Sequence, residues 1–275
     1  HKLNPRLVIA RVSGWGQTGP YAHKPGFGTL VEAMSGFAYL NGFPDREPAL
    51  PPLAMADMYA GIYGAFGVLA ALRNIEQGDG MGQVVDVALF ESIYSTLASE
   101  AVKFEATGTA SMRMGNQAVN TAPRNLYVCA DGRYLALSAS VQSMFEHLAH
   151  AIGHPGLLED ERFLTNEDRV RNCDALNAIL SEYFGQRSLD KNLELMDASG
   201  VTVGPVLSSA DLVGHPYAVG RDLFASIADA ELGTCSVPNP VPRLSRTPGQ
   251  KPRPAPKQGE HTEAILQLIR TSDET

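Results

Sequence analysis

The stretch that most constrains how this chain can fold is residues 53–83, where one aspartate is followed by a long apolar segment. Residues 58–76 contain no proline, and Arg73 and Glu76 are their only charged side chains. A helix that is apolar on nearly every side is buried on most of them. We therefore expect a largely buried helix that ends near Gly78.

Three glycines recur at every third position of this segment, at Gly61, Gly64 and Gly67. Each glycine inside a helix costs about 1 kcal/mol relative to alanine. Their repetition indicates that something approaches the backbone closely, either another helix or a ligand.

Asp57 stands just before the expected helix. A carboxylate there accepts hydrogen bonds from free N–H groups and meets the positive end of the helix dipole, so the simplest interpretation is a helix cap. The same position keeps a partly buried carboxylate ionised, and therefore nucleophilic, at neutral pH. Local pattern alone leaves both roles open.

The composition is that of a soluble globular chain. Its 275 residues are 44% hydrophobic and 19% charged, which allows one large or two medium domains. The net charge of −8 and the lack of a long basic run argue against binding to nucleic acid or an anionic membrane. The first residues are unlike a signal peptide. No apolar run reaches transmembrane length without glycine, polar or charged interruption, and the segment after Asp57 is too glycine-rich and too short to span a membrane. Three widely spaced cysteines without a CxxC pair favour a reducing cytoplasm.

The first hundred residues alternate strand and helix patterns. Strands are expected at 6–12 and 84–89, and helices at 29–40 and 90–104, with Thr29 and Glu32 as a capping pair. This alternation predicts a parallel α/β sheet, and the glycine-rich turn at 13–20 follows the first strand, where such sheets place ligands.

The pattern changes after residue 107. A polar linker or mobile loop leads to a hairpin at 125–138 around Asp131-Gly132. A small α+β unit follows, with helices expected at 141–152, 159–164, 172–184 and 189–199 and a β-type run at 201–207. Residues 208–275 are proline-rich, hold a terminal helix near 261–270, and have too few apolar residues to fold alone. We therefore expect a large α/β domain at 1–115, a small α+β domain at 116–210, and a return to the large domain at 211–275.

Other candidate sites are weak. His147, His150 and His154 share a helix face, but no nearby carboxylate completes a metal set, so no metal is expected. Ser13 and Ser92 lack the GxSxG elbow of serine hydrolases.

Several motifs together resemble the class III CoA-transferases, the group that includes formyl-CoA transferase, carnitine CoA-transferase and α-methylacyl-CoA racemase. They are SGWGQTGPY at 13–21, KPGFG at 24–28, ADMYAG at 56–61 and GDGMGQVVDVALFES at 78–92. The resemblance continues in order through YVCADGRYLAL at 127–137, GVTVGPVLSSADL at 200–212, NPVPRLSRTPG at 239–249 and GEHTEAIL at 259–266.

The resemblance implies a Rossmann-like large α/β domain made from both chain ends, with the small α+β domain inserted. Family members are longer, so about a hundred residues are expected to precede this segment. Two chains are expected to interlock as a homodimer, with active sites between the large domain of one chain and the small domain of the other.

The resemblance also implies the site and its chemistry. The catalytic aspartate falls on Asp57, and the residues that contact CoA fall on Pro25, Gly26, Phe27, Gly28 and Ala56. The carboxylate would pass CoA from an acyl-CoA to a small carboxylic acid through an anhydride and an aspartyl-CoA thioester, in a setting that excludes water and offers free N–H groups to an oxyanion. Acyl-CoA is then a substrate, and no permanently bound cofactor is expected.

Two departures bear on the alternatives. The racemase branch has a proton-transferring histidine where this chain has Phe27, which disfavours racemisation. Formyl-CoA transferase has a glycine run near the position of Thr121–Arg124 here, and Arg124 is instead a candidate partner for the acceptor carboxylate. A racemase or isomerase of the same fold and an inactive CoA-thioester-binding protein remain the alternative readings.

Overall fold

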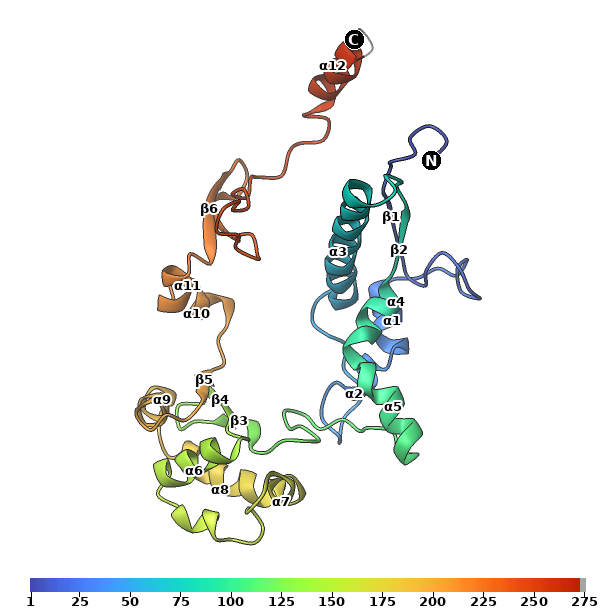
Figure 1. The fold of residues 1–275 in the computed structure, drawn as a ribbon. Coiled ribbons are helices and arrows are strands. Elements are labelled where there is room, and N and C mark those ends of the chain that lie inside the picture. Colours follow the sequence, from blue (N-terminus) through green and yellow to red (C-terminus); the bar gives the residue numbers. More distant parts are fainter. Residues whose placement is uncertain (273–275) are drawn as a thin grey trace. The chain divides into compact units, whose positions relative to one another are not determined.

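The computed structural model describes residues 1–272 (Figure 1). The chain divides into two compact units, one from His1 to Pro205 and one that begins at Val206. Each unit is described by itself.

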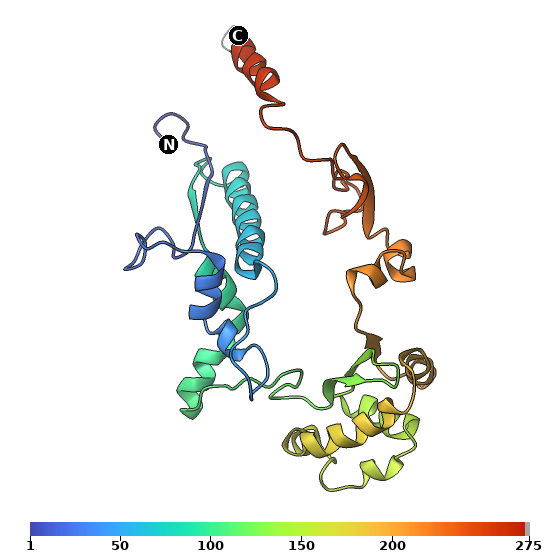
Figure 2. The same ribbon diagram turned by 180° about the vertical axis from the view of Figure 1, so that it is seen from behind.

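A parallel strand pair lies in the amino-terminal part of the first unit. Strand β1 (Ile9–Ser13) pairs with β2 (Val84–Ala88), with Ile9 opposite Val84. Helix α3 (Met55–Gln77) runs alongside this pair in both views (Figure 1, Figure 2). Helices α1 (Gly28–Met34) and α4 (Leu89–Tyr94) pack against α3 as well. The expected combination of parallel strands and helices is confirmed.

Helix α3 begins three residues earlier than its pattern predicted. Met55 and Ala56 are good helix formers that follow two prolines, so the helix starts there and Asp57 is its third residue. The N-cap is Ala54, which makes no side-chain cap bond. The interpretation of Asp57 as the N-cap is therefore wrong, although it remains in the first turn, where the helix dipole favours a carboxylate.

The outer face of α3 also differs from the expectation of burial on most sides. Its small residues are buried against β2 and α1, among them Ala56, Ala60 and Gly64. Large apolar side chains on other faces are exposed, with 66% of Ile62 and 70% of Phe66 accessible. At 23 residues, α3 is long and apolar enough to cross a membrane by length and composition, so the argument that no segment reaches that length was wrong. A single helix of this kind is weak support for a span, because core helices of soluble proteins also qualify.

A strand explains one of the three glycines on α3. A Cβ at Gly67 would lie 2.6 Å from Cγ1 of Val85, whereas one at Gly64 would make an ordinary contact of 3.9 Å with Cγ2 of Val87. Gly61 faces open space. The close neighbour at Gly67 is thus β2, rather than the helix or ligand that the spacing suggested.

Two expected helices are interrupted. The segment 29–40 forms α1 and α2 (Phe37–Leu40), because Gly36 between them adopts φ = +92°, outside the helical range. Phe27 precedes α1 as its N-cap residue, so the capping pair of Thr29 and Glu32 is wrong. The segment 90–104 becomes α4, the 3₁₀ turn η1 (Ser95–Leu97) and α5 (Ala98–Thr107).

The hairpin around Asp131-Gly132 is confirmed. Strands β3 (Arg124–Val128) and β4 (Tyr134–Ser138) are antiparallel, and β5 (Val203–Pro205) adds to β4. Gly132 has φ = +78°, the left-handed conformation that a tight turn requires. The loop before β3 is anchored by Arg113, whose guanidinium donates to the carbonyls of Tyr39 and Phe43, so it is more than a free linker.

Helices cover one face of this three-stranded sheet. They are α6 (Gln142–Ala151), the 3₁₀ turn η2 (Pro155–Leu158), α7 (Asn166–Arg171), α8 (Cys173–Gly185) and α9 (Leu189–Ala198). The core between them contains fully buried side chains such as Phe145, Leu176 and Phe184. The helix expected at 159–164 is wrong, because Asp160 accepts a hydrogen bond from the Arg162 N–H and closes a turn there.

The second unit holds two short helices, α10 (Ser209–Leu212) and α11 (Pro216–Gly220), and a hairpin of β6 (Phe224–Asp229) and β7 (Gly233–Pro238). The sequence reading missed this hairpin. The terminal helix α12 (Thr262–Ser272) was expected. The return of residues 211–275 to the large domain, and the boundaries at 115 and 210, stay predictions.

Candidate active site

A cavity of about 460 Å³ lies at the start of helix α3. Asp57, Phe27 and Gly28 line it, so three of the six predicted site residues meet in one place. The others in its wall are Thr29, Glu32, Leu50, Pro51, Pro52, Leu53 and Ala54. The proline-rich connector and the first turn of α1 thus form a hollow around the aspartate.

Asp57 lies directly against the backbone of Gly28. A Cβ built on Gly28 would overlap Oδ2 of the Asp57 carboxylate, so only glycine fits at this position while the carboxylate stays where it is. The Asp57 side chain is exposed rather than partly buried as the sequence suggested.

Glu32 holds the start of α3 in place from a different helix. This glutamate is only 4% exposed, and its Oε1 accepts a hydrogen bond of 3.1 Å from the N–H of Ala56. Ala56, which was predicted to contact CoA, is itself buried and does not line the cavity. Because Glu32 occupies the N–H of Ala56, that group is not free to stabilise an oxyanion, contrary to the general expectation for this helix start.

Sequence reasoning missed this role of Glu32, although one signal pointed toward it. Gly28 and Glu32 are four residues apart on α1, so they share a helix face. Since Gly28 was already a site candidate, that spacing places Glu32 beside it. Locally, however, Glu32 also fitted a capping pair with Thr29.

Pro25 and Gly26 hold the neighbouring loop together and are absent from the lining of this cavity. The carbonyl of Pro25 accepts a hydrogen bond of 3.1 Å from Nε1 of Trp15. A Cβ on Gly26 would lie 2.7 Å from that nitrogen, and one on Gly14 would lie 2.7 Å from Cα of Gly26. The two glycine-rich loops therefore pack backbone against backbone.

The loop that follows β1 is also tied to β2. The N–H of Gln17 donates to Oδ2 of Asp86 at 2.9 Å, and the ring of Trp15 lies 6.0 Å from that of Phe90. These contacts fix the loop at the carboxyl end of the parallel pair. The loop then leads into the Pro25–Gly28 segment.

Chemically, the cavity offers an exposed carboxylate at a helix start and a wall of proline, leucine and glycine. Within residues 1–272, no group of three His, Cys, Asp or Glu side chains is arranged to hold a metal ion. An exposed carboxylate in this setting is suited to nucleophilic attack or to proton transfer.

Comparison with known proteins decides the family. The model of CoA-transferase family III matches residues 1–262. This chain belongs to CoA-transferase family III. Among curated relatives in the family, the succinyl-CoA–D-citramalate CoA-transferase of Chloroflexus aurantiacus is 36% identical over 266 residues. That alignment covers 97% of this chain and 66% of the relative. The resemblance drawn from the motifs is confirmed.

Two further family members support the assignment. The succinate–glutarate CoA-transferase of Agrobacterium fabrum is 32% identical over 275 residues, with 99% of this chain and 68% of that protein covered. The crystal structure of a CAIB/BAIF family protein from Brucella suis is similar with a TM-score of 0.82 and 32% identity. It is covered over 69% of its length and this chain over 98%. The chain thus spans 66% of the length of the Chloroflexus protein, 68% of the Agrobacterium protein and 69% of the Brucella protein.

Proposed function

We propose that this chain is the catalytic part of a CoA-transferase in which Asp57 is the nucleophile. The observation that carries the proposal is the placement of the Asp57 carboxylate, exposed in a cavity against Gly28 at the start of α3, in a chain of CoA-transferase family III. Acyl-CoA is a substrate in this proposal, and no permanently bound cofactor takes part.

The proposed reaction exchanges partners at one carboxylate. Asp57 attacks the thioester carbonyl of the donor, the C–S bond breaks, and CoA thiolate leaves a mixed anhydride. The thiolate then attacks the aspartyl carbonyl, which releases the donor acid and forms an aspartyl-CoA thioester. The acceptor carboxylate displaces CoA thiolate from Asp57 to form a second anhydride, and the thiolate attacks the acceptor carbonyl. This last step releases the new acyl-CoA and restores Asp57. Covalent catalysis divides one difficult exchange into easier steps.

The substrates we propose are dicarboxylic acids and their CoA thioesters. The names of both relatives above pair two such acids, succinic with citramalic and succinic with glutaric. The cavity has space beside Asp57 for a short acyl chain. Its wall there consists of the small polar residue Thr29 and the apolar connector at 50–54.

The assembly belongs to the same proposal. We propose an interlocked homodimer with a Rossmann-like large domain and active sites shared between chains. A cytoplasmic location is supported by the three unpaired cysteines, and neither nucleic acid nor membrane is proposed as a partner. Exposed apolar side chains on α3 support contact with further protein surface.

Replacement of the nucleophile tests the proposal. In the purified protein, Asp57→Ala is expected to lower the transfer rate by at least about 1000-fold, because no covalent intermediate forms. Binding of acyl-CoA, measured by calorimetry, is expected to stay within a few-fold. Transfer at the normal rate by Asp57→Ala would contradict the proposal, and binding of acyl-CoA without transfer by the unaltered protein would indicate a binding protein instead.

Exchange of the α-proton separates transfer from racemisation. Phe27, at the cavity wall, has no titratable group to move a proton. Acyl-CoA incubated with the protein in deuterium oxide is therefore expected to gain no deuterium at the α-carbon beyond the background rate, as measured by NMR. Enzyme-dependent exchange would favour the isomerase reading.

A further inference from the structure

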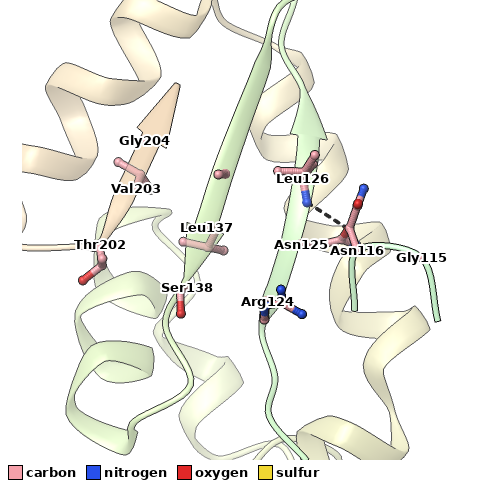
Figure 3. A pocket seen from close by; sticks show the side chains of 11 residues that line it. Gly115, Asn116, Arg124, Asn125, Leu126, Leu137, Ser138, Thr202, Val203 and Gly204 are labelled. Atoms are coloured by element: carbon pink, nitrogen blue, oxygen red, sulfur yellow. Dashed lines mark hydrogen bonds between the residues drawn. The ribbon is translucent and has the colours of Figure 1, made fainter. Parts of the chain in front are cut away.

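A second cavity, of about 410 Å³, opens on the face of the β3-β4-β5 sheet that its helices leave uncovered (Figure 3). Strand alternation separates the two faces: Tyr127 and Leu135 are buried in the helix-covered core, while Arg124 and Ser138 are exposed. Arg124 and Ser138 lie directly opposite each other in the register of β3 and β4. The cavity is therefore built on a rigid sheet.

The lining combines one positive charge with neutral polar groups. Arg124 is the charged residue, and hydroxyls of Ser138 and Thr202 and the amide of Asn116 surround the opening (Figure 3). The remaining lining residues are a second amide, Asn125, and six small or apolar residues: Gly115, Leu126, Ala136, Leu137, Val203 and Gly204. No aspartate or glutamate is among them. In a chain of net charge −8, this is a locally positive hollow.

The guanidinium of Arg124 is free to bind an anion. Its Nη1 donates to the carbonyl of Gln117 at 3.2 Å, and within the part of the chain that the structure describes it makes no ion pair. Arg133 at the other end of the same hairpin differs, because it pairs with both Asp131 and Asp190. A guanidinium that is paired with carboxylates of the protein attracts an added anion less strongly. Arg124 is not paired in this way.

The segment before Arg124 is clamped by α7. Asn166 accepts a hydrogen bond from the N–H of Ala122 at 3.1 Å and donates one to the carbonyl of Asn120 at 2.9 Å. The fully buried Arg169 donates from Nε to the carbonyl of Ala122 at 3.0 Å. Arg124 therefore starts from a fixed backbone, which favours binding of one ligand geometry.

We propose that this cavity binds the non-reacting carboxylate of a dicarboxylic acid, with Arg124 as the cation and Ser138 and Thr202 as hydroxyl donors. The inference rests on the proposed function and adds a substrate-selecting site to it. Guanidinium–carboxylate pairs form short, charge-assisted hydrogen bonds, which discriminate strongly against a methyl group at the same position. One guanidinium with neutral donors matches a single carboxylate better than a multiply charged phosphate.

The cavity around Asp57 and the cavity around Arg124 share no lining residue. The acid that reacts at Asp57 would thus be held at its far end by a different part of the protein. In the proposed homodimer, Arg124 serves the Asp57 of the partner subunit.

Kinetics with matched acceptors tests the inference. Transfer by the full protein is measured with succinate and glutarate and with butyrate and pentanoate, which have the same chain lengths but one carboxylate. With acetyl-CoA as a donor that has no second carboxylate, Arg124→Gln is expected to raise KM for the diacids about 10- to 100-fold while leaving KM for butyrate, KM for acetyl-CoA and kcat within about threefold. Ser138→Ala is expected to raise KM for the diacids about 3- to 10-fold.

Arg162→Gln is the matched control, because it removes the same charge from an exposed position that lines neither cavity, and it should change no KM. An unchanged KM for the diacids in Arg124→Gln would overturn the inference, and so would a rise in KM for acetyl-CoA instead, which would assign the anion to CoA. If the unaltered protein transfers no CoA, the proposed function fails on its own. Calorimetric binding of succinate that is lost in Arg124→Gln would then still support the cavity, and equal binding would overturn it.

Discussion

The two parts of the first unit bury their apolar side chains to very different extents. In residues 124–203 the sheet and its helices enclose seventeen buried apolar residues in one core. Around α3 the corresponding core has six, while large side chains such as Phe66 and Ile62 remain exposed. The first of these parts encloses its apolar side chains with its own helices, whereas α3 presents an exposed apolar surface of the kind that contacts other protein.

The comparison extends to the two cavities. The Asp57 carboxylate lies where loops and a helix start meet, held by single contacts such as that of Glu32 with Ala56. Arg124 lies on a sheet whose preceding loop is fixed by a buried arginine. The proposed nucleophile thus lies in the less enclosed part, and the proposed substrate-selecting group lies in the part with the larger core.

Arg169→Met should have the largest effect on stability. Arg169 is completely buried and donates hydrogen bonds to the carbonyls of Ala122, Phe163 and Ser140 and to Gln142, while burial lowers the pKa of its guanidinium. Methionine leaves these acceptors without donors, so the free energy of unfolding should fall by about 3–5 kcal/mol.

Urea denaturation followed by circular dichroism measures this change. Arg171→Gln on the same helix is the control, since Arg171 is exposed and its loss should cost at most about 0.5 kcal/mol. Equal effects of the two substitutions would mean that the 124–203 core does not depend on its buried cation.

Gly28→Ala should damage catalysis rather than stability. The added methyl group displaces the Asp57 carboxylate, and a shift of this size is expected to lower kcat about 100-fold with little change in KM. Gly156→Ala in η2 adds the same methyl group where nothing lies within 4 Å and should leave kcat unchanged. Steady-state kinetics would contradict the account if Gly28→Ala retained the full kcat.

Mixed dimers test whether the two parts act on one substrate from different chains. Asp57→Ala and Arg124→Gln chains are co-expressed and assayed at low diacid concentration, where each variant alone is nearly inactive. If sites are shared between chains, random pairing gives half hybrid dimers with one intact site each, and about a quarter of normal activity returns. If each chain carries a whole site, no activity beyond that of the separate variants is recovered.

Acid should weaken the 124–203 part slightly. Hydrogen bonds from Arg133 lower the pKa of Asp131, those from Arg162 lower that of Asp160, and the Thr165 hydroxyl and Arg171 lower that of Asp168. A carboxyl whose folded pKa is depressed contributes stability that is complete above its unfolded pKa, about 3.9, and is lost as pH falls through the folded value.

Urea midpoints should therefore be level between pH 7 and 5 and decline below about pH 4. In Asp131→Asn the urea midpoint should decline less below pH 4, because the asparagine side chain is neutral at every pH and has no charge to lose. A loss of stability that begins near pH 6 would contradict this assignment and indicate histidines instead.

The sequence predicted best where the determining contacts are local. The Asp131-Gly132 turn and the strands on either side could be read directly, because the turn conformation is set by neighbouring residues. Glu32 could not be read in the same way, since its hydrogen bond to Ala56 spans 24 positions. Arg169 was also missed, because a charged residue in a helix is normally exposed and only the folded loop supplies its acceptors.

The Asp57 position illustrates both outcomes. Motif resemblance selected Asp57 as the candidate nucleophile, and Asp57, Gly28 and Phe27 line the same cavity. Its place in the helix and its exposure were wrong, because the start of α3 is set by Glu32 from another helix and by the end of the proline-rich connector. Predicting a helix boundary therefore required a long-range contact.

Trapping of the covalent intermediate tests whether Asp57 is the nucleophile. The protein is incubated with succinyl-CoA and hydroxylamine, digested, and analysed by mass spectrometry. We expect a hydroxamate on Asp57 that is absent without acyl-CoA, because hydroxylamine cleaves the aspartyl-CoA thioester. A protein that transfers CoA while Asp57 stays unmodified, or that carries the hydroxamate on Glu32 in the same cavity, would contradict it.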